Sequence, residues 1–131
     1  MPRPHVVIIG SGFGGLFSAR ALAKADVDIT LVSKTTAHLF QPLLYQVATG
    51  ILSSGEIAPA TRDILANQKN AKVLLCEVSK INLNSHIVVA EKLSKQVILR
   101  YDYLIVAAGA GQSYFGNDHF AEWAPGMKTI D

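Results

Sequence analysis

Cysteine is almost absent from this 131-residue sequence, because Cys76 stands alone. A single cysteine excludes a disulfide framework, and it equally excludes a C-x-x-C redox pair or zinc pair. The scarcity also fits a reducing, intracellular setting. We interpret Cys76 as a small thiol that packs in the core.

Long apolar runs and a strong charge of one sign are absent too. No run approaches the roughly 18 residues of a membrane-spanning helix, and residues 1–4 lead straight into the first predicted strand, so no leader sequence is expected. The formal net charge is +2, and no basic block alternates with aromatic residues, which argues against a nucleic-acid partner. His86 and His119 have no second ligand at metal spacing, so no metal site is predicted.

The sequence does contain a strand–turn–helix–strand pattern at its start. Half of the residues are hydrophobic, which is typical of a globular domain with its own core. The apolar run His5–Ile9 predicts a strand covered on both faces. A helix is expected from about Gly14 to Ala25, and Asp28–Val32 predicts a second strand. A right-handed crossover then places the two strands side by side and parallel.

A G-x-G-x-x-G turn, Gly10–Gly15, joins the first strand to the helix. In the dinucleotide-binding fingerprint the first glycine, here Gly10, allows the tight turn. The second, Gly12, lets the backbone approach a pyrophosphate, and the third, Gly15, lets helix and strand pack closely. The phosphates then face free N–H groups at a helix N-terminus. The alternative is a structural glycine turn without a ligand.

The remaining chain predicts a second set of strands. Residues 35–54 are irregular but too apolar for a solvent loop, and Ser53 and Glu56 resemble a capping box. A helix is expected from there to about Gln68, with Pro59 in its first turn. Three further segments follow: a strand at Lys72–Val78, short antiparallel strands within Lys80–Arg100 with a turn at Asn84–Ser85, and a buried strand at Tyr101–Ala108.

These elements predict an α/β fold. The parallel sheet should have the strand order 72–78, 28–32, 5–9, 101–108. We expect helices on one face of this sheet and a three-stranded antiparallel meander on the other.

Three stretches carry a family resemblance: Val7–Gly15, His38–Gly50 and Ile105–Ala110. On these the chain resembles the N-terminal part of type II NADH dehydrogenases, the single-subunit NADH:quinone oxidoreductases, most closely their actinobacterial members. The second stretch is distinctive of that family. The other two are shared by the wider pyridine nucleotide-disulfide oxidoreductase superfamily. The resemblance implies a Rossmann-like FAD-binding domain and covers essentially the whole chain.

The resemblance also implies which residues hold FAD. The glycine turn, with Gly10, Gly12, Phe13, Gly14 and Gly15, would hold the pyrophosphate. The isoalloxazine ring would lie against Gln41, Pro42, Leu43 and Leu44, with Ala107, Ala108 and Gly109 at the strand end beside it. The backbone near Val78 would meet the adenine. No residue is a convincing general acid or base, and for His38 ordering the loop is favoured over proton shuttling.

One position departs from the family pattern. The fingerprint expects Asp or Glu at the end of the second strand, where it accepts a hydrogen bond from the ribose 2′-OH. Here Ser33 stands at that position and Lys34 follows. We expect a weaker contact to the adenosine end from these two residues, and an unchanged pyrophosphate site.

Other parts of the family pattern are missing. Residues 1–131 correspond to the N-terminal part of an FAD-binding domain; a second G-x-G-x-x-G for NADH, the strand that closes the domain and the C-terminal membrane helices are absent. The chain is a fragment, the ordered part of a longer protein or a truncated gene product. By itself it is expected to be inactive.

The parent would pass a hydride from NADH to FAD and electrons to a quinone. It would act at the cytoplasmic side of the bacterial cell membrane. Whether it forms a homodimer is left open by the sequence. One alternative is another flavin oxidoreductase, such as a sulfide:quinone reductase, which needs two redox cysteines. The other is a non-catalytic nucleotide-binding module.

Overall fold

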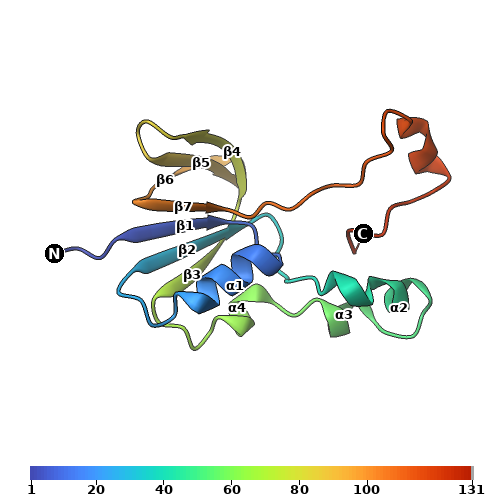
Figure 1. Cartoon of the computed structure of the whole chain (residues 1–131), viewed down its shortest axis with the longest axis horizontal. Helices are drawn as coiled ribbons and strands as arrows, with labels where there is room; N and C mark the ends of the chain where they lie inside the picture. Colours follow the sequence, from blue (N-terminus) through green and yellow to red (C-terminus); the bar gives the residue numbers. More distant parts are fainter. Residues whose placement is uncertain (131) are drawn as a thin grey trace.

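Four parallel strands form the central sheet of the computed structural model, which describes residues 1–130 (Figure 1). Their spatial order is β3-β2-β1-β7, which confirms the predicted order. The strands are β1 (His5–Ile9), β2 (Asp28–Ser33), β3 (Ala71–Leu75) and β7 (Tyr103–Val106). Because all four run the same way, their carboxyl ends meet at one edge of the sheet.

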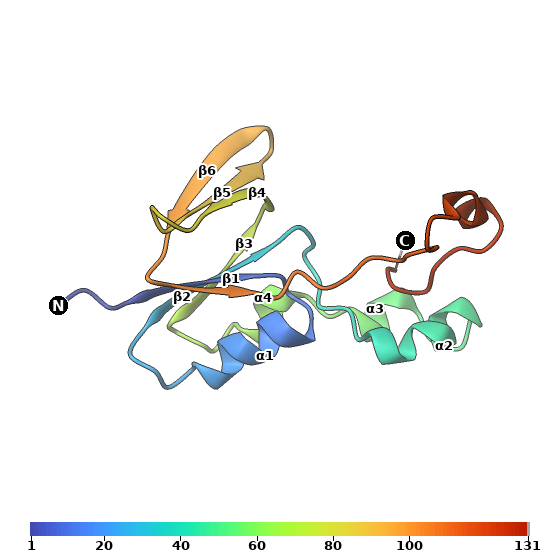
Figure 2. The same ribbon diagram turned by 45° about the horizontal axis from the view of Figure 1, so that its top comes forward.

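The sheet is covered on both faces, as its apolar strands require (Figure 2). Alternate residues of β1 point to opposite sides, so Val6 and Ile8 pack with the helix α1 (Phe13–Ala21), while Val7 and Ile9 pack under the meander. All four side chains are buried. The prediction of helices on one face and a meander on the other is therefore confirmed.

The meander consists of β4 (Glu77–Asn82), β5 (Ile87–Lys92) and β6 (Lys95–Arg100). A two-residue turn joins the last two strands, and both turn residues have positive φ, 48° at Leu93 and 63° at Ser94. Such angles at both positions are those of a type I′ turn, whose twist matches antiparallel strands. Val78 lies in β4, so the predicted strand 72–78 was drawn too long: the chain crosses between the sheets at Cys76.

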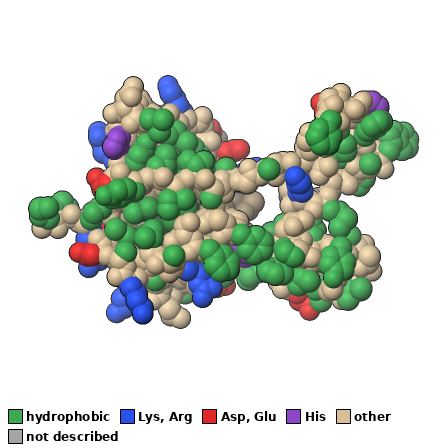
Figure 3. All heavy atoms as spheres, viewed as in Figure 1, with side chains coloured by type: hydrophobic (Ala, Val, Ile, Leu, Met, Phe, Trp, Pro, Cys, Tyr) green, Lys and Arg blue, Asp and Glu red, His purple; other side chains and the backbone are tan. Residues whose placement is uncertain are grey.

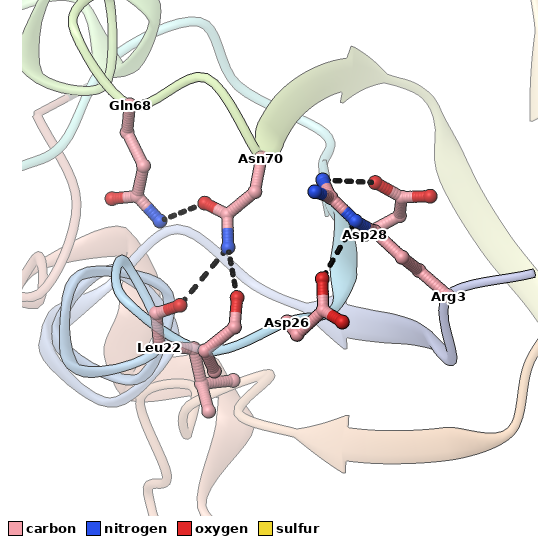
Figure 4. Close-up of polar contacts among 7 residues, drawn as sticks. Arg3, Leu22, Asp26, Asp28, Gln68 and Asn70 are labelled. Carbon is pink, nitrogen blue, oxygen red and sulfur yellow. Dashed lines mark hydrogen bonds and ion pairs between the residues drawn. The ribbon is translucent and has the colours of Figure 1, made fainter.

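Helix α1 ends at Ala21, four residues before the predicted end. Two side chains that precede β3 donate to carbonyls at the end of α1 and just after it, and Figure 4 shows the bonds of Asn70. Asn70 Nδ2 donates to Leu22 O at 3.0 Å and to Ala25 O at 3.3 Å. Gln68 Nε2 donates to Ala19 O at 2.7 Å. These bonds satisfy the carbonyls that a helix end leaves free, and they fasten α1 to the start of β3.

The predicted helix over 53–68 is wrong, because two short helices replace it. These are α3 (Ser54–Ile57) and α4 (Thr61–Ile64). Pro59 disfavours the helical conformation of the residue before it, and Ala58 accordingly leaves the helix with φ −130° and ψ 64°. Ala60 instead forms an antiparallel bridge to Ala37. The capping-box residues do interact, since Ser53 N donates to Glu56 Oε2 at 2.6 Å.

The stretch 35–54, predicted to be irregular, contains two short helices. They are η1 (Gln41–Leu43) and α2 (Leu44–Ala48). Together with α3 they form a lobe beyond the carboxyl edge of the sheet (Figure 1). No helix among residues 1–130 is both long and apolar enough to cross a membrane.

β7 is an edge strand, which corrects the prediction of a buried strand over 101–108. Within residues 1–130 it pairs only with β1, and Tyr103 and Val106 are 63% and 60% exposed. Beyond it the chain runs out as a tail that carries η2 (Asp118–Glu122). Hydrophobic side chains are exposed on this tail and on the lobe (Figure 3), among them Phe115, Trp123, Tyr45 and Ile51. Exposed apolar side chains gathered in this way are typical of a contact surface.

Candidate dinucleotide-binding site

The carboxyl edge of the sheet brings three chain segments together. Ile9, the last residue of β1, pairs with Val32 of β2 on one side and with Val106 of β7 on the other. The next residues stay attached, since Gly10 N donates to Val32 O at 2.8 Å and Ala107 N donates to Ile9 O at 2.8 Å. The glycine turn, the end of β2 and the segment after β7 therefore lie side by side.

Two of the predicted glycines are required by close backbone approaches. A Cβ at Gly15 would stand 1.7 Å from Gly10 O, and a Cβ at Gly10 would stand 2.1 Å from Ala107 O. Gly10 also has φ +104°, a conformation that side chains rarely adopt. Gly14 is less crowded, with its Cβ position 3.3 Å from Ala107 Cβ. Gly10 and Gly15 thus have the turn and packing roles predicted for them.

Gly12 differs from these two, because nothing lies within 4 Å of its Cβ position. It is the N-cap of α1, with no side-chain hydrogen bond to the cap and no acidic residue in the first turn. The first N–H groups of a helix have no partner within the helix, and the helix dipole places partial positive charge there. The turn therefore offers open space and unsatisfied donors together, which is what a pyrophosphate requires.

His38 fastens the following loop to the glycine turn. Its ring is buried, and Nδ1 lies 2.8 Å from Ser11 O. A carbonyl oxygen only accepts, so Nδ1 carries the proton and donates. The ring also meets Phe13 edge-on at 5.1 Å, and Phe13 meets Phe40 at 5.5 Å. These contacts support the loop-ordering role favoured for His38.

A pair of buried hydroxyls occupies the end of β2. Ser11 Oγ and Ser33 Oγ are 2.8 Å apart, and Thr35 N donates to Ser33 Oγ at 3.2 Å. Both serines are buried, whereas Lys34 is exposed. Sequence reasoning missed Ser11, because its partner is 22 residues away and no local pattern signals the contact.

The predicted flavin-contacting residues lie in the lobe and the tail. Gln41 and Pro42 are exposed, and Gln41 Nε2 donates to Met127 O of the tail at 3.2 Å. Leu43 is half-buried, while Leu44 is only 5% exposed and packs inside the lobe. Ala108 and Gly109 are exposed just after β7, and Gly109 has φ +73°.

Val78 lies apart from the edge residues, because its side chain packs between the two sheets. Its backbone comes two residues after Cys76, whose N donates to Ser33 O at 2.9 Å just beyond the end of β3. The Cys76 thiol is buried, and desolvation raises its pKa above the ordinary value. Cys76 therefore has a packing role and not a nucleophilic one.

Among residues 1–130 no three metal-binding side chains cluster.

Comparison with known proteins assigns the class. The family model for pyridine nucleotide-disulphide oxidoreductases matches residues 4–129, so the chain belongs to that family.

Within the family, the chain is similar to type II NADH:quinone oxidoreductases. It is 67% identical to NdhA of Mycobacterium tuberculosis over 98% of this chain and 27% of that protein. It is 66% identical to Ndh of the same organism, over 99% of this chain and 28% of that protein. The chain thus spans little more than a quarter of the length of these relatives.

Solved structures support the same grouping. NDH2 from Plasmodium falciparum, in complex with NADH, superposes with a TM-score of 0.87 at 28% identity; the match covers 98% of this chain and 27% of that one. The sulfide:quinone oxidoreductase of Aquifex aeolicus superposes with a TM-score of 0.75 at 27% identity, covering 85% and 25%.

Proposed function

We propose that the glycine turn binds the pyrophosphate of FAD. The observation that carries the proposal is the uncapped N-terminus of α1 beside the open space at Gly12. Membership of the pyridine nucleotide-disulphide oxidoreductase family implies a flavin and a pyridine nucleotide. The first glycine turn of such a chain is the one that we assign to FAD.

We propose that the protein carrying this chain is an NADH:quinone oxidoreductase. Its relatives with 66–67% identity are named for that activity. A bound flavin would supply the redox chemistry, which is hydride acceptance from NADH and electron transfer to a quinone. NADH would bind to a second domain, and contact with the membrane would come from a C-terminal region, both outside residues 1–131.

The residues of this chain bind and orient the flavin. The free N–H groups at the start of α1 would hold the phosphates. The lobe, with Gln41, Pro42 and Leu43, and the strand end at Ala107–Gly109 would flank the ring. The Leu44 side chain, being buried, would support the lobe. His38 fixes the distance between lobe and turn through its bond to Ser11 O.

A sulfide:quinone reductase is the competing function, because one such enzyme shares the fold. That chemistry needs a pair of redox cysteines. Cys76 is the only cysteine in the sequence, it is buried, and its pKa is raised. On the evidence of residues 1–131, these features favour the NADH-dependent function over sulfide oxidation.

The test is to measure NADH oxidation with a soluble quinone by the purified protein that contains this chain, loaded with FAD. We expect quinone-dependent oxidation of NADH and none of sulfide. Residues 1–131 expressed alone should show no turnover, because they lack a second glycine turn to hold NADH near the flavin. Rapid turnover by residues 1–131 alone would contradict the assignment of NADH to a second domain.

A further inference from the structure

The end of β2 lacks the acidic residue that hydrogen-bonds a ribose in the dinucleotide-binding fingerprint. In dinucleotide-binding folds a carboxylate at this point accepts a hydrogen bond from the ribose 2′-OH, and a cation nearby accommodates a 2′-phosphate instead. Here the strand ends with Ser33, and the chain continues as Lys34-Thr35-Thr36. The residue types at this strand end are therefore those that suit a phosphate.

The side chain of Ser33 at this strand end is uncharged and is held by hydrogen bonds. Ser33 is 5% exposed, and its Oγ lies 2.8 Å from Ser11 Oγ. Thr35 N donates to the same oxygen at 3.2 Å. The Ser33 hydroxyl is thus fixed between the glycine turn and the next loop. It carries no charge that would repel an anion.

Lys34 supplies the charge at this place. Its side chain is exposed, and among residues 1–130 the ion pairs given by the structure involve Arg3, at the opposite edge of the sheet. The acidic residue nearest to the end of β3 in sequence is Glu77. Its side chain lines a hollow on the meander together with Glu91 and Leu93. Lys34 takes part in neither of these ion pairs, so its positive charge is available at the strand end.

We propose that the adenosine end of this site accepts a ribose that carries a 2′-phosphate. The inference rests on the proposed function, since it takes the glycine turn to hold an adenosine dinucleotide. The ligand class is an adenosine nucleotide with phosphate at both the 5′ and 2′ positions. Ser33 determines this tolerance by replacing a carboxylate, and Lys34 contributes the attraction.

The test is displacement of FAD from the purified protein, because a nucleotide that occupies this site excludes the flavin. The competitors are adenosine 5′-monophosphate, adenosine 2′,5′-bisphosphate and, as a control for charge alone, adenosine 3′,5′-bisphosphate. We expect the 2′,5′-bisphosphate to displace FAD at a concentration no higher than the monophosphate requires, and lower than the 3′,5′-bisphosphate requires.

Two variants separate the contributions of Ser33 and Lys34 to binding of the 2′-phosphate. Ser33→Asp should weaken the 2′,5′-bisphosphate roughly tenfold or more relative to the monophosphate, since like charges then meet at close range. Lys34→Gln, at an exposed position, should remove the preference for the 2′,5′-bisphosphate over the 3′,5′-bisphosphate. A wild-type protein that requires a higher concentration of the 2′,5′-bisphosphate than of the monophosphate overturns this inference alone. Failure of FAD itself to bind overturns the proposed function.

Discussion

The two edges of the parallel sheet differ in whether side chains satisfy the free backbone N–H and C=O groups near them. At the amino edge side chains satisfy them: Asn70 and Gln68 donate to the last carbonyls of α1, and Asp102 Oδ2 accepts from His5 N at 2.6 Å. At the carboxyl edge the start of α1 has no side-chain cap and no acid. Unsatisfied backbone groups are costly, and leaving them open at this edge is what the proposed phosphate site requires.

A hollow at the amino edge sharpens this comparison. It measures about 670 Å³ and is lined by Arg3, Arg20, Lys24 and Asp26 among others. Some of its polar groups are already engaged: Arg3 Nε pairs with Asp26 Oδ1 at 2.7 Å, and Asn70 donates to carbonyl oxygens (Figure 4). Exposed pairs of this kind stabilise little. Size alone is therefore a poor guide to the ligand site.

The largest expected effect separates two glycines of the same turn. Gly15→Ala should lower the free energy of unfolding by about 3 kcal/mol or more, because its Cβ would overlap Gly10 O. Gly12→Ala should lower it by about 1 kcal/mol or less, since its Cβ meets open space. Urea unfolding of both variants measures this. Equal losses would contradict the distinction between packed and open glycines.

His38→Ala comes next. It removes a buried ring and leaves Ser11 O without its donor, so we expect a loss of about 2–4 kcal/mol in the free energy of unfolding. His38→Asn keeps a donor near the same place and should recover about 1 kcal/mol. NADH:quinone turnover of a folded His38→Asn protein should stay within about tenfold of wild type. A loss of about a hundredfold or more would favour a proton shuttle instead.

Asn70→Ala tests the amino edge. Losing its two hydrogen bonds to the segment just after α1 should cost about 1–2 kcal/mol of unfolding free energy. The affinity for FAD should not change, because the residue lies at the opposite edge from the glycine turn. Thermal unfolding and flavin binding measured on the same sample check both statements. A large loss of FAD affinity in a folded variant would break the separation between the two edges.

Glu56→Gln has the smallest expected effect. Hydrogen bonds from the Ser53 backbone, and then from its hydroxyl, lower the pKa of Glu56 below the ordinary 4.5. The carboxylate therefore stabilises the folded state above pH 4.5, and this contribution is lost as the pH falls through the lowered pKa. The variant should melt slightly below wild type at pH 7 and level with it well below pH 4.5. A constant gap across that range would rule out the carboxylate as the cause.

The sheet was predictable because its strands are short apolar runs separated by recognisable turns. His5–Ile9 and Asp28–Ser33 flank a glycine turn and a helix. The right-handed crossover rule then makes the two strands parallel neighbours in the sheet. The alternation within 80–100 similarly fixes the meander. The glycine turn was predictable for the same reason, since its residues are consecutive.

Features that depend on distant contacts were not predictable. Ser11 and Ser33 meet only after folding. The apolar residues of β7 resemble a buried strand, yet within residues 1–130 one of its sides has no neighbour. The helix over 53–68 failed for a local reason, because Pro59 acted on the residue before it, not as a first-turn residue.

The central claim is that the open glycine, Gly12, is where a flavin dinucleotide approaches the backbone. The most direct measurement is the FAD content of purified wild-type and Gly12→Val proteins, with unfolding free energies determined on the same samples. We expect wild type to retain FAD and the variant to be folded but without flavin, because the valine side chain fills the space that the pyrophosphate requires. A folded Gly12→Val protein with one FAD per chain would contradict the account.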